Sequence, residues 1–439
     1  MWMNVSANCS GGLDGENMRE MKDSGIEWIG KMPKNWATKR CKYLSTFLNG
    51  YAFDSKDLQI DFIYPVIRIG DIKNGTIDTI HCCGVNDNNG LDNYRVLKND
   101  ILLAMSGATV GKVGIADKTE YAYINQRVGI IRTKYPKFVY YCLSTKEFID
   151  YIILHANGSA QPNVSGDVYG EYVIPWPNLE KQTEIVSFLD TKCSEIDDLS
   201  EDIQKEIETL ESYKKSVITE AVTKGLDPDV EMKDSGLQWI GKMPKHWSLI
   251  RGKYCLDYLQ KPVREDDGVI TCFRDGEVTL RSNRREEGFT MSDKEIGYQG
   301  IDVGDLVVHG MDGFAGAIGI SDSRGKASPV LNVLESYENK KYLMYYLRSM
   351  AYSDVFVALA TGIRVRSCDL RWNKLAELFY PIPPKKEQDK IVSFIDDKLC
   401  QTDKLIAMKQ EQLNVLADYK KSLIYEYITG KKEIANEDN

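Results

Sequence analysis

At 439 residues the chain is longer than one ordinary domain, so we expect two to four domains. Hydrophobic residues make up 43% and charged residues 28%, which is typical of folded rather than disordered protein. A net charge of −9 excludes a uniformly basic nucleic-acid-binding surface. The lack of any run of about 18 apolar residues excludes a membrane-spanning helix.

Residues 1–20 are rich in Gly, Asn and Ser and lack the charged-then-apolar order of a signal peptide, so we expect a flexible leader there. The ten cysteines contain no CxxC pair, which argues against both a zinc site and a disulfide framework. We therefore expect reduced cysteines in a cytoplasmic protein.

The next element in chain order is a turn-rich opening motif at residues 21–36, with the sequence MKDSGIEWIGKMPKNW. A near copy at residues 232–247, MKDSGLQWIGKMPKHW, differs at three positions. Trp36 and Trp247 end the two copies, and we expect both to be buried packing anchors. At nearly the same separation, IVSFLD (185–190) recurs as IVSFID (391–396), and YKKS recurs at 213–216 and 419–422. The chain is a tandem duplication of a whole module.

Short runs rich in Val, Ile, Tyr and Gly follow each opening motif and predict strands of a twisted, partly open sheet. In the first copy these are Tyr64–Ile69, Ile101–Met105, Gly111–Ile115 and Val128–Arg132. In the second copy they are Val269–Phe273, Leu306–Gly310, Ala317–Ile320 and Val330–Leu334. Phe138–Leu154 and Lys340–Leu359 predict helices.

A Pro-x-Pro stop in each copy precedes a long helix, predicted at about 179–224 and 386–429. Apolar residues at heptad spacing form a seam in each helix: Ile196, Leu199, Ile203, Ile207, Leu210 and Val217 in the first, and Leu399, Ile406, Leu413, Leu416 and Leu423 in the second. Thr402 and Lys409 weaken the second seam. Such seams must be covered in water, and an antiparallel pair within one chain is favoured. The alternative is that each helix packs flat on its own domain.

Acidic residues gather in the first long helix and the linker after it, whereas residues 37–171 are nearly neutral. Polar and cationic residues between the predicted strands are therefore candidates for contact with nucleic acid, because Arg, Lys, Asn and Gln suit base edges and phosphates. The candidates in the first copy are Arg68, Lys73, Lys112, Asn125, Gln126, Arg127, Gln161 and Asn163. Those in the second copy are Arg274, Arg281, Asn283, Arg284, Arg285, His309, Arg364 and Arg366. The alternative for each loop is a solvated surface without a ligand.

No pattern in the sequence nominates a catalytic or metal site. Residues 107–112 (GATVGK) have three residues between the glycines instead of four, and Val113 follows where a phosphate loop has Ser or Thr. The four histidines are far apart and no GxSxG occurs. We expect no catalytic residue, no metal and no cofactor on this chain.

The doubled frame resembles the specificity subunit of type I restriction-modification enzymes. The resemblance rests on WIGKMPKNW and WIGKMPKHW, on QTEIVSFLD and QDKIVSFID, and on the two YKKS segments, and it covers essentially residues 23–430. It implies an α+β fold in which two globular target-recognition domains, each a twisted mixed sheet with helices, are separated by two long helices in an antiparallel coiled coil.

The resemblance also implies a division of the chain and a set of partners. The expected parts are a leader (1–20), opening motif and recognition domain 1 (21–178), helix 1 (179–225), linker, opening motif and recognition domain 2 (226–384), helix 2 (385–430) and a flexible tail (431–439). Each domain would read one half of an asymmetric bipartite sequence in double-stranded DNA, and the helices would set the spacing.

The implied partners in a prokaryotic cytoplasm are two methyltransferase subunits that bind S-adenosylmethionine, and restriction subunits that use ATP and Mg. A coiled-coil protein scaffold without a DNA role, and an enzyme with an unrecognised site, are the alternatives from other classes.

Overall fold

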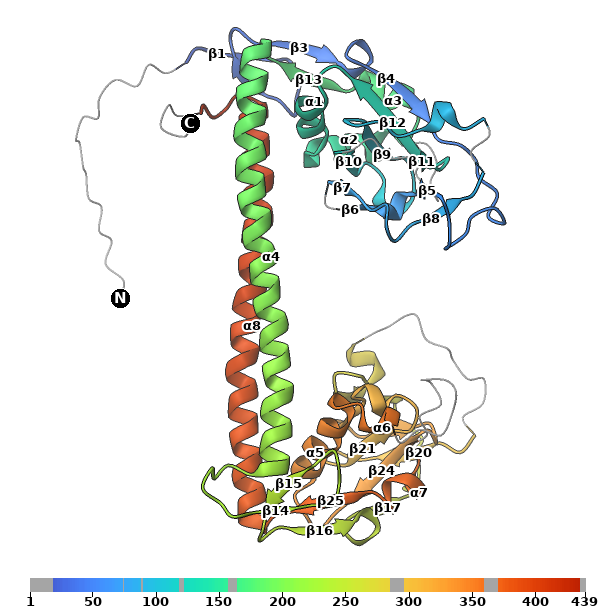
Figure 1. Ribbon diagram of the computed structural model, residues 1–439, viewed down its shortest axis with the longest axis vertical. Coiled ribbons are helices and arrows are strands. Elements are labelled where there is room, and N and C mark those ends of the chain that lie inside the picture. The colour runs from blue at the N-terminus through green and yellow to red at the C-terminus, as the bar shows by residue number, and fades with distance from the viewer. Residues whose placement is uncertain are drawn as a thin grey trace, which may run out of the picture. The chain divides into compact units, whose positions relative to one another are not determined.

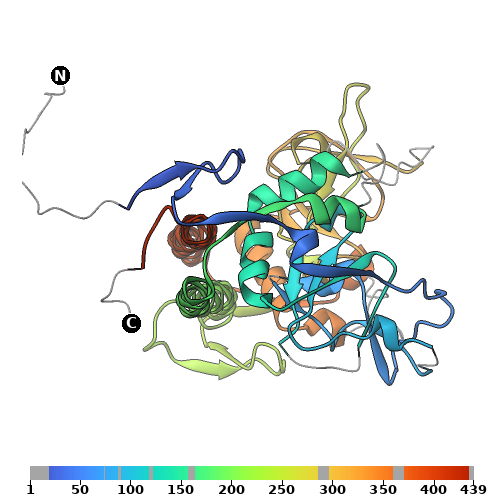
Figure 2. The ribbon, with the colours of Figure 1, turned by 90° about the horizontal axis from the view of Figure 1, so that it is seen from above.

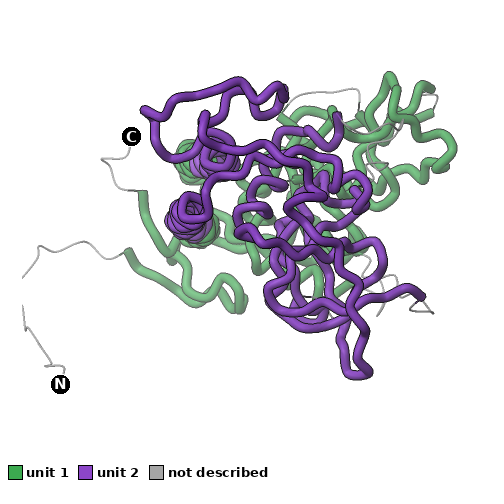
Figure 3. Tube along the Cα trace, turned by 90° about the horizontal axis from the view of Figure 1, so that it is seen from below, with its two compact units in different colours: residues 1–201, 413–439 green, residues 202–412 purple. Residues whose placement is uncertain are grey.

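The computed structural model describes residues 19–73, 75–87, 90–117, 122–156, 164–284, 296–358 and 370–434. The chain forms two compact units (Figure 3): residues 1–201 with 413–439 make unit 1, and residues 202–412 make unit 2. Each unit contains one globular domain and a stretch of both long helices. Most of the expected leader and the end of the expected tail, residues 435–439, lie outside the described residues.

Unit 1 opens with a hairpin of β1 (Met21–Asp23) and β2 (Lys31–Pro33). Its central sheet is antiparallel and has the order β10-β9-β12-β4. These strands are β4 (Ser45–Asn49), β9 (Ile101–Ala104), β10 (Val113–Ile115) and β12 (Val128–Thr133). A smaller sheet joins β5 (Tyr64–Ile67), β8 (Cys83–Val85) and β11 (Tyr123–Ile124), with β5 and β11 parallel. The remaining pairs are β6 (Ile72–Lys73) with β7 (Thr76–Ile77), and β3 (Ala37–Arg40) with β13 (Val173–Trp176).

Unit 2 repeats the opening hairpin and the strand order of the central sheet. After the hairpin of β14 (Met232–Asp234) and β15 (Lys242–Pro244), the central sheet runs β17-β24-β21-β22. Its strands are β17 (Asp257–Leu259), β21 (Leu306–His309), β22 (Ile318–Ile320) and β24 (Leu331–Glu335). Three further pairs are β16 (Ser248–Arg251) with β25 (Phe379–Ile382), β18 (Ile270–Cys272) with β19 (Val278–Leu280), and β20 (Gln299–Ile301) with β23 (Gly325–Ala327). All eight strands predicted from sequence occur, most of them shorter than predicted.

The helix predicted over residues 138–154 is wrong, because two helices occupy this stretch. α1 (Pro136–Leu143) ends at Ser144, and α2 (Lys146–His155) starts after Thr145, whose hydroxyl accepts a hydrogen bond from the amide of Phe148. The apolar period continues across the break, but Ser144 caps the C-terminus of α1 and Thr145 caps the N-terminus of α2. α3 (Gly166–Glu171) completes the helices of the first domain.

The helix predicted over 340–359 also ends early. α5 spans Lys340–Tyr352, and Asp354 has a left-handed backbone with φ 53°, after which a short α6 (Val355–Ala358) begins. A left-handed residue cannot continue an α-helix, which explains the stop. α7 (Trp372–Leu375) precedes β25.

The long helices are α4 (Leu179–Lys224) and α8 (Lys385–Ile428), and they lie side by side in Figures 1 and 2. In unit 1 the rings of Phe188 and Tyr427 are 4.4 Å apart, and Asp197 binds Lys420 at 2.6 Å. In unit 2 Glu206 pairs with Lys409, and Lys214 binds Asp403 at 2.7 Å. Partner numbers fall on one helix as they rise on the other, so the pairing is antiparallel in each unit. The predicted fold class is confirmed.

The seam of α8 follows an unbroken four-three spacing through Leu399, Thr402, Ile406, Lys409, Leu413, Leu416, Lys420 and Leu423, all of them at least half-buried. Thr402 and Lys409 therefore belong to the seam. The hydroxyl of Thr402 donates to the carbonyl of Lys398 at 2.8 Å, so its burial leaves no unsatisfied group.

Leu199 was predicted in the seam of α4, and this is wrong because its side chain is 49% exposed. Ser200 takes the position instead, since Ile196, Ser200, Ile203 and Ile207 keep the four-three spacing. Ile196, Ile203 and Ile207 are buried, whereas Leu210 and Val217 are half-buried. Near the end of α4 burial moves to Ile218, Ala221 and Val222, which the second domain covers.

The opening motifs close the ends of the helix pair. Trp36 is buried with Ile424 and Ile428 of α8, and Trp247 is buried with Val222 of α4 and Ile391 of α8. The predicted role of the two tryptophans as packing anchors is confirmed. A left-handed glycine follows each helix, Gly225 at φ 77° and Gly430 at φ 69°. A Cβ on Gly225 would lie 3.2 Å from the Trp247 ring, and one on Gly430 would lie 2.9 Å from the Trp36 ring.

One end of each central sheet is fixed by a buried aspartate. Asp100 accepts the Leu97 amide at 2.7 Å and binds Arg132 at 2.7 Å. Asp305 accepts the Asp302 amide at 2.8 Å and binds Lys261 at 2.7 Å. In unit 2 the network extends, because Lys261 and Arg324 both contact the carboxylate of Asp302, at 2.9 and 2.7 Å.

We predict that Gly225→Ala lowers the free energy of unfolding of the chain by more than Gly236→Ala does. Both glycines have positive φ, 77° and 74°, so each substitution costs about 1 kcal/mol of backbone strain. Only Gly225 has the Trp247 ring at 3.2 Å, whereas nothing lies within 4 Å of a Cβ on Gly236. Urea unfolding of the two variants measures the difference, and equal losses would contradict the packing role of Gly225.

The unit 2 network should be sensitive to acid. Lys261 and Arg324 lower the pKa of Asp302 to about 2, compared with an unfolded value of about 3.9. The ion pairs then stabilise the fold above about pH 4 and stop doing so as the pH falls toward 2. The unfolding midpoint of the protein should exceed that of Asp302→Asn at pH 6, and the gap should shrink by pH 2.5. A gap that stays constant over this range would show that the carboxylate charge does not contribute.

Candidate nucleic-acid interface

An aspartate on each long helix holds the globular domain of its unit. In unit 1 the hydroxyl of Tyr141 on α1 donates to Asp190 of α4 at 2.8 Å, and Lys137 pairs with the same carboxylate. In unit 2 the hydroxyl of Tyr345 on α5 donates to Asp396 of α8 at 2.6 Å, and Lys341 pairs with it at 2.9 Å. Burial raises the pKa of both tyrosines, so each remains a hydrogen-bond donor at neutral pH.

The repeated glutamine fixes the approach to each helix. The side-chain amide of Gln182 donates to the carbonyl of Pro177 at 2.9 Å, and that of Gln388 donates to the carbonyl of Pro383 at 2.9 Å. Both glutamines are buried. The doubled segments QTEIVSFLD and QDKIVSFID therefore supply the same two attachments in both copies, one through the glutamine and one through the aspartate.

In unit 1 four candidate residues come together at one end of the sheets, and we call this group the first polar edge: Arg68, Asn125, Gln126 and Arg127. The Asn125 amide donates to the Ile67 carbonyl at 3.0 Å, and the Met105 amide donates to the Arg127 carbonyl at 2.9 Å. Arg68, Gln126 and Arg127 are exposed and Asn125 is half-buried. The amide of Val164 donates to the Met105 carbonyl at 2.9 Å, so the segment that follows residue 163 reaches this edge.

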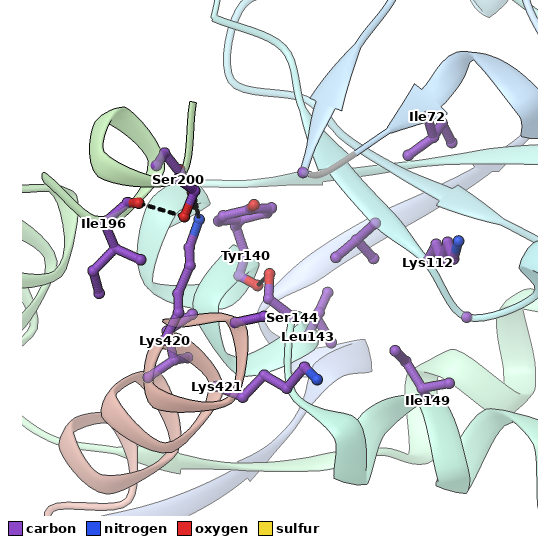
Figure 4. Close-up of a pocket in the computed structure, with 16 residues that line it drawn as sticks. Ile72, Lys112, Tyr140, Leu143, Ser144, Ile149, Ile196, Ser200, Lys420 and Lys421 are labelled. Carbon is purple, nitrogen blue, oxygen red and sulfur yellow. Dashed lines mark hydrogen bonds and ion pairs between the residues drawn. The ribbon is translucent and has the colours of Figure 1, made fainter. Parts of the chain in front are cut away.

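Lys73 lies outside the first polar edge, whereas Lys112 lies at the same end of the central sheet as Arg127, because its carbonyl accepts the Ala104 amide at 2.9 Å. Lys73 belongs to the β6–β7 hairpin and pairs with Asp78 at 3.1 Å, and hydrogen bonds from the His81 backbone and from Lys73 hold the pKa of Asp78 well below its usual range. Lys112 lines a cavity of about 420 Å³ inside unit 1, across from Lys420 (Figure 4). Apolar residues such as Ile149 and Ile424 form much of the cavity wall. Lys420 is neutralised there by Asp197.

In unit 2 the second polar edge comprises Arg274, Arg284 and His309. Arg274 is exposed and binds Asp312 at 2.8 Å. The Arg284 guanidinium contacts Asp275 at 2.8 Å and Glu277 at 3.0 Å, and it stacks 4.2 Å from the centre of the Phe273 ring. Cation–π stacking and two carboxylates thus fix this guanidinium at the surface.

His309 holds the turn after β21. Its Nδ1 accepts the amides of Met311 at 3.2 Å and Asp312 at 2.9 Å, which places the ring proton on Nε2. Burial lowers the pKa of His309, so the ring is neutral at pH 7. The amide of Leu370 donates to the Gly310 carbonyl at 2.8 Å, the counterpart of the Val164 contact in unit 1.

Arg281 and Asn283 point back to the β18–β19 hairpin. Arg281 donates through Nε to Thr271 at 3.3 Å, and Asn283 donates to Thr279 at 2.8 Å. The candidates Gln161, Asn163, Arg285, Arg364 and Arg366 lie outside the described residues.

The sequence analysis did not nominate the acidic partners at the second edge, Asp275, Glu277 and Asp312. Carboxylates of this kind are frequent on any protein surface, and only their convergence on two arginines distinguishes them. Within the described residues no group of three or more His, Cys, Asp or Glu is placed to hold a metal ion, and the eight cysteines there are free thiols. None of the helices in the same residues has the length and apolarity to cross a membrane.

Residues 33–209 match the family model described as the type I restriction modification DNA specificity domain. The MjaX and MjaVIII type I restriction enzyme specificity subunits of Methanocaldococcus jannaschii are 28% and 24% identical to the chain over 235 and 249 residues. The MjaX alignment covers 51% of this chain and 53% of that protein, and the MjaVIII alignment covers 55% and 52%. The chain thus spans about half the length of each of these two relatives.

Two other relatives align along most of the chain. The StySPI specificity subunit of Salmonella potsdam is 20% identical over 425 residues, covering 92% of the chain and 90% of that protein, and the EcoBI specificity subunit of Escherichia coli is 23% identical over 418 residues, covering 88% and 84%.

A chain of a solved type I restriction-modification system has the same fold, with a TM-score of 0.63 at 15% identity over 91% of this chain and 99% of that one. The doubled sequence and these alignments agree: residues 33–209 match a type I restriction modification DNA specificity domain, and along most of its length the chain is similar to the specificity subunits of type I restriction enzymes.

Proposed function

We propose that this chain is the non-catalytic, DNA-reading subunit of its enzyme, and that each globular domain reads one half of an asymmetric bipartite sequence. One observation carries the proposal. The central sheets of the two domains share the same strand order and the same turn contacts, Val164 to Met105 and Leu370 to Gly310, yet the domains present different side chains around those contacts. Two equal frameworks can place both domains on DNA in the same way, and their different polar edges can then recognise two different half-sites of one sequence.

The net charge of −9 requires that DNA contacts be local. The first polar edge presents Gln126 and Arg127 to solvent. The second presents Arg274 and Arg284 already paired with carboxylates. Exposed ion pairs contribute only about 0–1 kcal/mol, so guanine or phosphate can replace the carboxylates at small cost. The pairs then pre-orient the arginines before DNA binds.

The remaining chemistry is assigned to partners. Two modification subunits would dock on this chain and bind S-adenosylmethionine, and restriction subunits would supply ATP- and Mg-dependent cleavage. The helix pair would fix the distance between the half-sites. In this proposal no cofactor binds to the specificity subunit itself.

Exchange of residues 248–378 for those of another specificity subunit should change only one half of the DNA sequence that the assembled enzyme methylates. The exchange retains Pro383, Gln388 and Asp396, and the incoming domain must supply a tyrosine in place of Tyr345 to keep the hydrogen bond to Asp396. The reciprocal exchange of residues 37–172 is the matched control and should change only the other half. Sequencing of methylated DNA gives the result, and a change in both halves from one exchange would rule out modular reading.

Arg127→Ala should lower the affinity of the assembled enzyme for its DNA sequence about tenfold or more, because one base-edge or phosphate contact is worth about 1–3 kcal/mol. Lys73→Ala removes the same charge away from the edge and should change affinity less than about threefold. Fluorescence anisotropy at fixed salt compares them. Equal losses would place the contact surface elsewhere, and an enzyme that binds no DNA at all would support the protein-scaffold alternative.

A further inference from the structure

A small surface feature occurs twice with the same geometry, once in each unit. In unit 1 the carboxylate of Glu171 binds Arg40 at 2.9 Å and also pairs with Lys42, and Tyr43 follows directly. In unit 2 Glu377 binds Lys253 at 2.9 Å and also pairs with Arg251, and Tyr254 follows. We call these the twin patches: Arg40, Lys42, Tyr43 and Glu171 in the first, and Arg251, Lys253, Tyr254 and Glu377 in the second.

The tyrosines of the twin patches are exposed to the same degree, 74% each. A lysine ammonium lies over each ring, 5.4 Å from the centre of Tyr43 and 5.6 Å from that of Tyr254. Exposed rings add nothing to the core, so the packing of the fold does not require tyrosine here. Arg40, Lys42 and Tyr43 follow the opening motif at the same spacing as Arg251, Lys253 and Tyr254, so these side chains belong to the repeated frame. Because packing does not require the exposed tyrosines, their repetition indicates a ligand shared by both modules.

A shared ligand cannot be the base sequence, because the two polar edges differ. Two candidates remain, the DNA backbone and two copies of one protein. The carboxylate between the two cations disfavours phosphate, since it would meet the anion at close range. The neighbouring cations lower the pKa of Glu171 and of Glu377, so both stay ionised at neutral pH. An exposed tyrosine beside an arginine is instead typical of the anchoring residues of protein interfaces.

We propose that each of the twin patches docks one copy of the same modification subunit, with Tyr43 and Tyr254 as the anchoring rings. This inference rests on the proposed function, because it assumes that the chain assembles with modification subunits. Each patch carries two cations and one anion, so the partner surface should offer a pocket for the ring with an acidic rim. The two subunits would then bind in equivalent ways, although the domains read different DNA.

The test uses the full chain with its purified modification subunit and native mass spectrometry. The protein should bind two copies, Tyr43→Ala and Tyr254→Ala should each weaken one site at least tenfold, and the double variant should weaken both. Tyr43→Phe and Tyr254→Phe keep the ring and should restore most of the affinity. Tyr337→Ala is the matched control, because this side chain is 85% exposed and belongs to neither patch.

A second measurement separates protein docking from DNA contact. Glu171→Gln raises the local positive charge, so it should tighten DNA binding by the chain alone if the patch contacts phosphate. Our proposal expects unchanged DNA affinity. Tyrosine variants that still bind two subunits with full affinity, or tighter DNA binding by Glu171→Gln, would overturn it. A chain that binds no modification subunit in any form would instead contradict the proposed function itself.

Discussion

One aspartate links each globular domain to a long helix, Asp190 in unit 1 and Asp396 in unit 2, beside apolar residues of the helix that are buried in the core of the domain. Each carboxylate receives a tyrosine hydroxyl, at 2.8 and 2.6 Å, and a lysine from the same helix of its domain. A charge-assisted hydrogen bond of this kind is stronger than a neutral one and fixes direction as well as distance. Because the attachment lies in the repeated frame, the strands beyond it are free to differ. This separation of frame and surface is the physical basis of the proposal that one chain carries two readers.

Polar residues in the seam of the helix pair specify the register of the two helices, which apolar residues alone would leave undetermined. Lys409 with Glu206 and Lys214 with Asp403 in unit 2, and Lys420 with Asp197 in unit 1, are ion pairs between facing helices. Partly exposed pairs contribute little stability, but charged residues between helices select partner orientation and register. A one-heptad slip would separate each lysine from its carboxylate. The pairs thus favour a single register of the two helices, as the proposed spacer role requires.

The sequence predicted the parts that depend on period and repetition. Seven-residue spacing located both long helices, and short β-branched runs located strands such as β9 and β21. It did not predict the break at Thr145, because capping by one hydroxyl interrupts a helix without interrupting its apolar period. It misplaced Leu199, since neighbouring positions 199 and 200 differ by only about 100° around a helix and apolarity alone favoured leucine.

The candidate site was less predictable than the fold. Residue type alone could nominate Arg274 and Arg284, but not the carboxylates that orient them, because Asp275 and Glu277 lie in the β18–β19 turn and Asp312 lies in the turn after β21. Lys112 was nominated by charge, and in the structure it lines a cavity in unit 1 while remaining exposed. The shared arrangement of Glu171 and Glu377 emerges only when the strands β13 and β25 are seen beside β3 and β16.

The central claim is that the two domains read different halves of one DNA sequence at a fixed separation. The most direct measurement is single-molecule sequencing of modified bases in DNA from cells that carry this chain and its modification partner. The account predicts one motif with two unlike halves, a gap of constant length and unspecified sequence, and modification in both halves. A continuous motif, a palindrome, or a gap of variable length would contradict it.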